Sequence, residues 1–324
     1  MLAVLWLSAA LSAIAFSVAI SVRGETERAS TASEGLRAYY LASGSIERAV
    51  LWIFWGSQYG KYYQAPMPWL HFNYPSGKAD VEVIPEASKM NINSASAQDL
   101  DRLLVAVGAD PERAQAIVRG ILTWRAQGPE GGVLASLGNA AGGPTFMPPH
   151  ASFQEIEELL LVPGMTPDLF YGSYDRDSQG RLFPRGGLKD CLSVYGASGQ
   201  FDINTAHPAL LMALGINPAE VAAIMGMRRA TPFRSMSQLA AMGLGGPGFQ
   251  RLGVGGGTVW TLRATAYPRL VNGQSSDLTR TVSATVKFLP PNTTPAYQYL
   301  RWYDDSPSAG FAVNPQTAGA PRIP

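Results

Sequence analysis

The first 22 residues form an uncharged, mostly apolar run, and the first ionisable side chain is that of Arg23. As a helix, a run of this length measures about 33 Å, against about 30 Å for the hydrocarbon core of a bilayer. It is therefore long enough to span a membrane. Because it lacks the basic start of a secretory signal peptide, we interpret residues 1–22 as a retained anchor, with a cleaved signal peptide as the alternative.

Helical patterning continues without a break through residues 23–57. Apolar and small residues recur there at helical spacing, while charged residues such as Glu27, Glu34 and Arg48 mostly lie off that stripe. The pattern predicts one long helix, membrane-embedded at 1–22 and amphipathic at 23–57. The stripe comprises Ala29, Ala32, Leu36, Tyr39, Ile46, Val50 and Ile53.

The middle of the chain contains an internal repeat at residues 89–125 and 200–229. Each copy has Ile-Asn-Ser/Thr-Ala, a leucine-bearing helix, a Gly-x-x-Pro turn and a second helix, so each copy is predicted to be a helical hairpin. The expected buried positions are Leu100, Leu103, Leu104, Ala114, Ile117 and Val118 in the first copy, and Leu210, Leu211, Leu214, Val221 and Ile224 in the second.

Local chemistry predicts where the helices of each hairpin begin and end. Side-chain oxygens of Asn93 with Ser94, and of Asn204 with Thr205, are expected to accept first-turn amides of the first helix. The glycines at 108 and 215 release the chain from the first helix, and the prolines at 111 and 218 suit the first turn of the second.

Extended segments flank the repeats. Alternating apolar and polar residues predict a short strand around Val81 and Val83, and a closing meander at 258–268, 277–289 and 296–304. Such a meander needs a partner for its apolar face, and the amphipathic half of the first helix is the candidate. Between the repeats we expect a third helix, a polar turn and a short strand ending at Tyr195.

Several segments together resemble a known family, minor pseudopilin K of the type II secretion system (general secretion pathway protein K). They are LAVLWLSAALSAIAFS, AYYLASGSIERA, KMNINSA, EELLLVPGMTPDLFYG, FDINTA and the strands ending RWYD. The resemblance implies an α+β fold, in which a pilin-like N-terminal helix packs on an antiparallel sheet and a large α-helical domain is inserted. We expect the head to begin at 58–88, the inserted domain to occupy 89–240, and the closing strands to lie within 241–324.

The resemblance also implies a function. Members sit at the tip of the pseudopilus and start filament assembly with other minor pseudopilins, the I, J and H components, and with the major pseudopilin, for protein export across the outer membrane. The expected location is the bacterial inner membrane, single-pass, with the head in the periplasm and with secreted proteins as further partners. Members are cut by prepilin peptidase after a basic leader. Either this chain is the processed form or its start codon was assigned inside that leader, and we expect the second.

The apolar run lacks the glutamate that most pilin-type subunits carry near the mature start. Position 5 is Leu5, and the first acid is Glu25. An ionisable group in hydrocarbon needs a partner, so its absence suits a subunit that ends a filament; an ordinary one-helix membrane protein is the alternative. The expected assembly surface consists of Leu5, Ala29, Ala32, Leu36, Tyr39, Ile46, Val50 and Ile53.

Nucleic-acid binding is the alternative function. The repeats also resemble helix-hairpin-helix modules, as in a membrane-anchored DNA-binding protein of the competence type. Their turns, at 108–110 and 215–217, lack the second glycine that lets phosphate approach, and the whole chain has a net charge of +1. We therefore expect no nucleic-acid partner.

Candidate metal and catalytic residues are few. Asp175, Asp177 and Gln179 alternate before a glycine as in half of a calcium loop, but the glutamate of a full loop is missing. Calcium is the candidate ion, a solvated polar turn is the alternative, and no cofactor is required. The three histidines lie in separate segments, and Cys191 is interpreted as a packed thiol. We assign no enzymatic activity; an anchored hydrolase is a third hypothesis.

Overall fold

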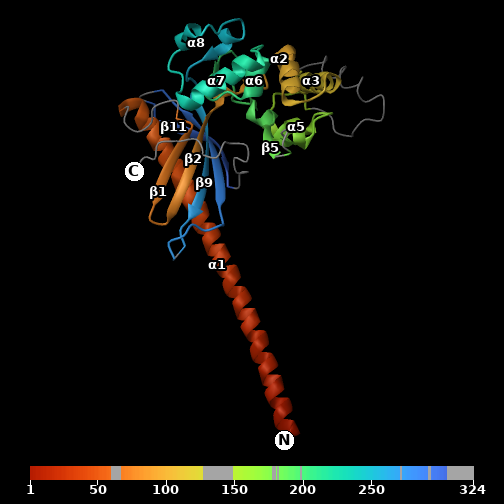
Figure 1. Ribbon diagram of the computed structural model, residues 1–324, viewed down its shortest axis with the longest axis vertical. Coiled ribbons are helices and arrows are strands. Elements are labelled where there is room, and N and C mark those ends of the chain that lie inside the picture. Colours follow the sequence, from red (N-terminus) through yellow and green to blue (C-terminus); the bar gives the residue numbers. More distant parts are fainter. Residues whose placement is uncertain are drawn as a thin grey trace.

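One helix, α1 (Leu2–Tyr59), runs through the predicted anchor and into the head as a single element. Its N-terminal half projects away from the rest of the chain, and its C-terminal half lies along a β-sheet (Figure 1). The computed structural model describes residues 1–59, 67–126, 149–176, 180, 182–197, 199–270, 272–290 and 293–304.

The sheet is antiparallel and has five strands in the order β1-β2-β9-β10-β11. The three predicted closing strands and the strand around Val81 are confirmed. The first strand was not predicted, because it lies within an aromatic-rich stretch without clean alternation. The strands are β1 (Trp69–Tyr74), β2 (Gly77–Pro85), β9 (Val259–Pro268), β10 (Arg280–Phe288) and β11 (Tyr297–Tyr303).

Alternate residues of the central strands face α1, which covers this side of the sheet as predicted. The strand residues are mostly valine and alanine, and the helix presents alanines between larger apolar residues, so the two backbones approach closely. The resulting core contains Ala42, Ile46, Ala49, Val50 and Ile53 of the helix, and Val81, Val83, Leu262, Ala264, Ala266, Val282, Ala284 and Val286 of the sheet.

A helical domain is inserted between β2 and β9 and lies at the end of the sheet far from the N-terminus (Figure 1). Three pairs of short strands connect its segments. β3 pairs with β6 and β7 pairs with β8 in parallel, and β4 pairs with β5 as an antiparallel hairpin. Its α-helices are α2 (Ala97–Val107), α3 (Pro111–Arg125), α5 (Pro167–Tyr171), α6 (Pro208–Ala213), α7 (Pro218–Ala230) and α8 (Ser237–Ala241). The 3-10 turns are η1 (Glu86–Ser88), η2 (Ile156–Leu161), η3 (Leu188–Asp190) and η4 (Phe249–Arg251); the short strands are β3 (Met90–Asn91), β4 (Gly172–Arg176), β5 (Leu182–Gly186), β6 (Leu192–Ser193), β7 (Phe201–Asp202) and β8 (Leu252–Gly253).

Two expectations for this domain need correction. The domain does not end at 240, because Phe249 and Leu252 belong to its core and β8 pairs with β7. The predicted third helix is instead the 3-10 turn η2 and the short helix α5, because Pro163 and Gly164 between them interrupt the helical path.

The repeat is confirmed as a pair of helical hairpins, α2–α3 and α6–α7, and every predicted core position in both copies is buried. The predicted ends at Gly108 and starts at Pro111 and Pro218 are confirmed, but the predicted N-caps of the first helices were wrong. The first helices begin later, and Ser96 and His207 cap them by accepting the amides of Asp99 and Ala209.

The asparagine at the equivalent position of the two repeats makes a different contact. The side-chain amide of Asn93 donates to the carbonyl of Phe153 (3.0 Å) and its oxygen accepts the amide of the same residue (2.8 Å). Asn204 binds Phe233 in the same way and at the same distances. Both copies therefore hold a following segment by one backbone pair.

Candidate assembly surface

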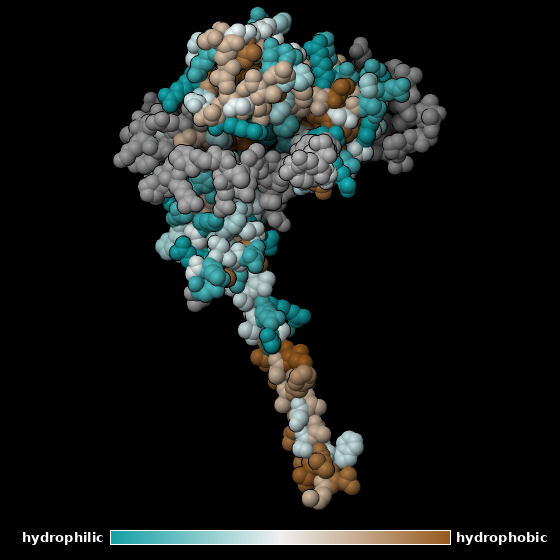
Figure 2. All heavy atoms as spheres, viewed as in Figure 1, coloured by the Kyte–Doolittle hydropathy of each residue, from teal (hydrophilic) through white to brown (hydrophobic). Residues whose placement is uncertain are grey.

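The N-terminal half of α1 is uncovered. Every side chain from Met1 to Arg23 is exposed, including Leu5, although nearly all are apolar or small. Figure 2 shows this half as a brown shaft that turns teal where the helix nears the head. Among the described residues, α1 is the one helix long and apolar enough to cross a membrane, with a mean hydropathy of 2.2 over its most apolar window.

Two of the four serine hydroxyls within the apolar run are bonded by the helix itself. The hydroxyls of Ser8 and Ser21 donate to the carbonyls of Leu5 and Ser17, at 2.9 Å and 3.0 Å. A serine bonded in this way does not require water, so these two positions are compatible with hydrocarbon.

Ion pairs mark the point where the helix becomes water-compatible. Arg23 pairs with Glu27 (3.2 Å) and Arg28 with Glu25 (2.8 Å), each about one turn apart. These side chains are highly exposed, so the pairs add little stability. They mark the end of the apolar run, because they place four charged side chains directly after Val22.

The predicted assembly residues fall into two groups. Leu5, Ala29, Ala32 and Leu36 are exposed, and their role in assembly stays a prediction. The others pack within the chain: Tyr39 is partly buried against the sheet, and Ile46, Val50 and Ile53 are buried in the core between α1 and the sheet. The assignment of these last three to a surface for another subunit is therefore corrected.

An open groove of about 890 Å³ lies where α1 leaves the sheet. One side is the helix, including the predicted residues Ala32, Leu36 and Tyr39, and the other is the rim of the head. The remaining lining residues are Gly24, Glu27, Arg28, Thr31, Gly35, Leu278, Arg280 and Asp304.

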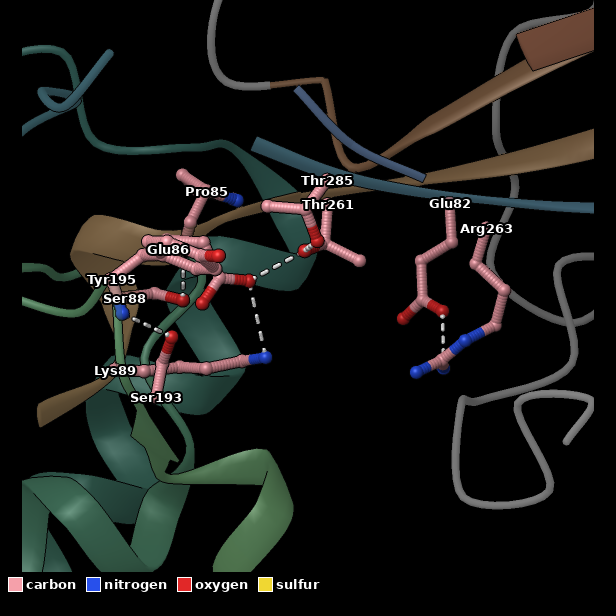
Figure 3. A network of polar contacts seen from close by, with 10 residues as sticks. All are labelled: Glu82, Pro85, Glu86, Ser88, Lys89, Ser193, Tyr195, Thr261, Arg263 and Thr285. Carbon is pink, nitrogen blue, oxygen red and sulfur yellow. Dashed lines mark hydrogen bonds and ion pairs between the residues drawn. The ribbon is translucent and has the colours of Figure 1, made fainter. Parts of the chain in front are cut away.

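A polar network joins the sheet to the helical domain (Figure 3). Glu86, in η1, is almost fully buried and accepts the hydroxyl of Thr261 (2.7 Å) and the ammonium of Lys89 (3.3 Å). Nearby, Arg263 of β9 pairs with Glu82 of β2 at 3.0 Å. Burial raises the pKa of Glu82, and Arg263 opposes that shift. A buried carboxylate with two donors fixes the orientation of the segment that leaves the sheet.

A second contact lies at the β11 edge of the sheet. Arg301 of β11 pairs with Glu155 at 2.8 Å, and the hydroxyl of Tyr303 donates to the same carboxylate at 3.2 Å. Burial and the negative charge of Glu155 raise the pKa of Tyr303 to about 12. The helical domain thus contacts two strands that are not neighbours, β9 and β11.

Three arginines of the hairpins bond within the chain, whereas Arg102, Arg119 and Arg229 are exposed. Arg125 donates to the carbonyls of Ile92 and Ala95 (2.7 and 2.6 Å), and Arg228 donates to their counterparts in the second copy. Burial lowers the pKa of Arg228 to about 10. Arg113 donates to a carbonyl and a hydroxyl of the 164–166 turn. The three arginines that bond within the chain reduce the basic surface that the hairpins could offer to phosphates.

The hairpin turns themselves agree with this conclusion. The middle residue of each turn, Ala109 in the first copy and Ile216 in the second, is buried in the domain core. The amides of these two residues donate to carbonyls of the preceding helix, those of Leu104 and Leu211, and are therefore not free to bind a phosphate.

The calcium candidates lie largely beyond what can be described. Asp177 and Gln179 fall outside the described residues, and for Asp175 the backbone alone is placed, in β4 opposite Phe183. Calcium binding there stays a prediction. Within the described ranges no group of three or more His, Cys, Asp or Glu side chains is close enough to hold a metal ion.

The remaining reactive side chains have structural contacts. His71 pairs with Asp80 across β1 and β2 (2.6 Å), His150 contacts the carbonyl of Thr123 (3.1 Å), and His207 caps α6. The thiol of Cys191 is buried, which raises its pKa well above the usual value, so the packed thiol is confirmed.

No family model and no curated protein matches the chain. Among solved structures, it is similar to a chain in the crystal structure of the GspK-GspI-GspJ complex from the type 2 secretion system of enterotoxigenic Escherichia coli. The TM-score is 0.56 at 18% sequence identity, and the match covers 85% of this chain and 98% of that chain. The likeness shows the fold, a long N-terminal helix on an antiparallel sheet with several further helices, which confirms the predicted α+β class.

Proposed function

We propose that this chain is a minor pseudopilin of a type II secretion system, of the K type, held in the inner membrane by residues 1–22. The observation that carries the proposal is the division of α1. Its first half is apolar and uncovered, and one face of the same unbroken helix is buried in the head from Ala38 onward. Such a helix is both membrane anchor and structural strut, as in a subunit that assembles through its helix.

The likeness to a chain of a three-protein complex supports partners of the same kind. The name of that complex includes GspI and GspJ, so the I and J components are the first partners to test, followed by the H component and the major pseudopilin. We expect prepilin peptidase to process the chain, the head to lie in the periplasm, and secreted proteins to leave through the outer membrane.

A position at the tip of the filament follows from two features of this chain. Leu5 stands where an acid would pair with a neighbouring subunit, and no acid precedes Glu25. The helical domain adds bulk at the end of the sheet away from the membrane (Figure 1). A subunit of this shape would obstruct another placed above it, so we propose that it starts the filament.

An in-frame deletion in the native bacterium tests the function. Secreted substrates should accumulate in the periplasm and disappear from the medium, and the full chain expressed in trans should restore export. In detergent, the tagged full chain should co-purify I-type and J-type subunits. Export that is unchanged by the deletion would refute the proposal.

The tip position needs its own measurement. An affinity tag on this chain, visualised by gold labelling of overproduced filaments, should mark one end of each filament. A tag on the major pseudopilin is the matched control and should mark the whole length. Labelling of this chain along the shaft would contradict the tip position while leaving the secretion function intact.

A further inference from the structure

The imidazole of His207 lies where two elements of the helical domain meet. It is the N-cap of α6, and its Nδ1 accepts the amide of Ala209 at 3.2 Å. Its other nitrogen, Nε2, faces the last residue of β5, because a Cβ added at Gly186 would collide with Nε2 and with the adjacent Cε1. The ring therefore fills the space between α6 and the base of the β4–β5 hairpin.

The carboxylate of Asp190 reaches the same place from η3. Its Oδ2 lies 3.2 Å from the point that a Cβ on Gly186 would occupy, the point at which that Cβ would also meet the ring of His207. The same oxygen accepts the backbone amide of Gly187 at 3.1 Å. Asp190 is thus bonded to the residue that follows β5 and stands beside the imidazole, so one carboxylate lies between two groups that compete for it.

Gly187 connects this carboxylate to both strands of the hairpin. A Cβ added at Gly187 would collide with the backbone of Phe170 and of Gly172, so the chain after β5 crosses the start of β4 with backbone against backbone. Gly172 in turn pairs with Gly186 across the hairpin. The hydrogen bond from the amide of Gly187 to Asp190 therefore holds the crossing from which both strands extend.

Among the described residues, two charged side chains act on the ring of His207. Burial lowers the pKa of His207 most, Asp190 opposes this shift, and Arg228 of α7 adds to it. Arg228 is engaged elsewhere, since it donates to two backbone carbonyls of the second repeat. The thiol of Cys191, beside Asp190, is buried with a raised pKa and stays neutral. Because α6 itself has no charged residue, Asp190 is the anion that a protonated ring would meet.

We propose that His207 and Asp190 form an acid-sensitive switch that couples the start of α6 to the base of the β4–β5 hairpin. While the ring is neutral, Nδ1 caps α6 and Asp190 holds Gly187. A second proton on the ring, taken from solvent, turns Nδ1 into a donor that can no longer accept the amide of Ala209. The imidazolium then attracts the carboxylate of Asp190 away from Gly187. This inference concerns the helical domain alone and does not depend on the proposed function.

Hydrogen exchange of the full chain in detergent, read by mass spectrometry at about pH 7.5 and about pH 5.5, tests the switch. The data are corrected for the intrinsic pH dependence of exchange. We expect acid to lower protection about tenfold both at the hairpin base and in the first turn of α6, because each segment loses about one hydrogen bond. Helix α3, in the first repeat, is the internal control and should keep its protection. Unchanged protection of the hairpin base would overturn the inference.

Two variants separate the coupling from a simple loss of the helix cap. In Asp190→Asn the side-chain oxygen still accepts the amide of Gly187, but it has no charge for the imidazolium to attract. Acid should then loosen the start of α6 and leave the hairpin base protected. In His207→Asn, which caps a helix without titrating, neither segment should respond to acid. Protection of α3 shows whether each variant is folded, and either variant alone decides the question. A wild-type response at the hairpin base of a folded variant would overturn the switch.

A histidine titration measures the interaction directly. The chain has three histidines, so carbon-labelled histidine gives three NMR signals, and the signal lost in His207→Asn is that of His207. Because Asp190 raises the pKa of His207, Asp190→Asn should move the midpoint of this titration to lower pH. An equal or higher midpoint in the variant would show that Asp190 does not stabilise the protonated ring, and the proposed switch would be refuted.

Discussion

Asn204 satisfies both polar groups of one backbone position, the amide and the carbonyl of Phe233. Replacing it with alanine leaves both groups without their partner beside a buried phenylalanine. We expect Asn204→Ala to lower the free energy of unfolding by about 2–4 kcal/mol, measured by chemical denaturation of the full chain in detergent. Asn272→Ala, in an exposed loop, is the control and should cost less than about 0.5 kcal/mol. Equal losses would show that the backbone pair contributes little.

The asparagine motif illustrates what sequence can predict at the level of a residue. The repetition of Ile-Asn-Ser/Thr-Ala showed that Asn93 and Asn204 matter, and their place before a helix suggested a cap. Their real partners are 60 and 29 residues further along the chain. A local pattern holds no information about such a partner, so the importance of the residue was predictable and its contact was not.

His207 gives the helical domain a dependence on pH. Its Nδ1 accepts the amide of Ala209, which requires the neutral ring. Burial lowers its pKa, opposed by Asp190 and assisted by Arg228. Because the folded pKa lies below the unfolded value of 6.5, the contribution to stability is complete above pH 6.5 and is lost as the pH falls toward the folded pKa.

The matched variant is His207→Asn, since asparagine is also a good N-cap and does not titrate in this range. We expect the free energy of unfolding of the wild type to fall between pH 6.5 and 5 more steeply than that of the variant. Near pH 8 the two should agree within about 1 kcal/mol. Parallel curves for the two proteins would exclude His207 as the titrating group.

Among the elements, α1 has a covered face and an uncovered face along one continuous helix. Ile46 is fully buried against the sheet, whereas Leu36, ten residues earlier, is 59% exposed. Ile46→Ala should cost about 2–5 kcal/mol through lost burial and a cavity. Leu36→Ala should change stability by less than about 0.5 kcal/mol. Denaturant unfolding of both variants in detergent gives the comparison, and equal losses would contradict the packing described here.

Elements with strong periodicity were predictable, and elements shaped by tertiary contact were not. The long helix, the hairpins and the closing strands each repeat apolar residues at the period of their structure. By contrast, β8 has two residues and exists because β7 lies beside it. η2 and α5 look like one helix in sequence, but Pro163 and Gly164 divide them. The assembly stripe failed at Ile46, Val50 and Ile53 because periodicity marks a buried face without saying which partner buries it.

At the scale of the whole molecule, the apolar segment 1–22 and the head share one helix but not one core. Buried side chains of α1 begin at Ala38, so residues 1–22 add nothing to the packing of the head. We expect the intact chain to sediment with membranes and to need detergent for extraction. A chain lacking residues 2–22 should stay in the supernatant without detergent and should melt within about 4 °C of the intact chain in the same detergent. Leu36→Ala, made in the intact chain and in the shortened chain, controls for changes to the exposed part of α1. Recovery of the intact chain in the supernatant would refute the anchor, and unfolding of the shortened chain would show that the apolar half supports the head.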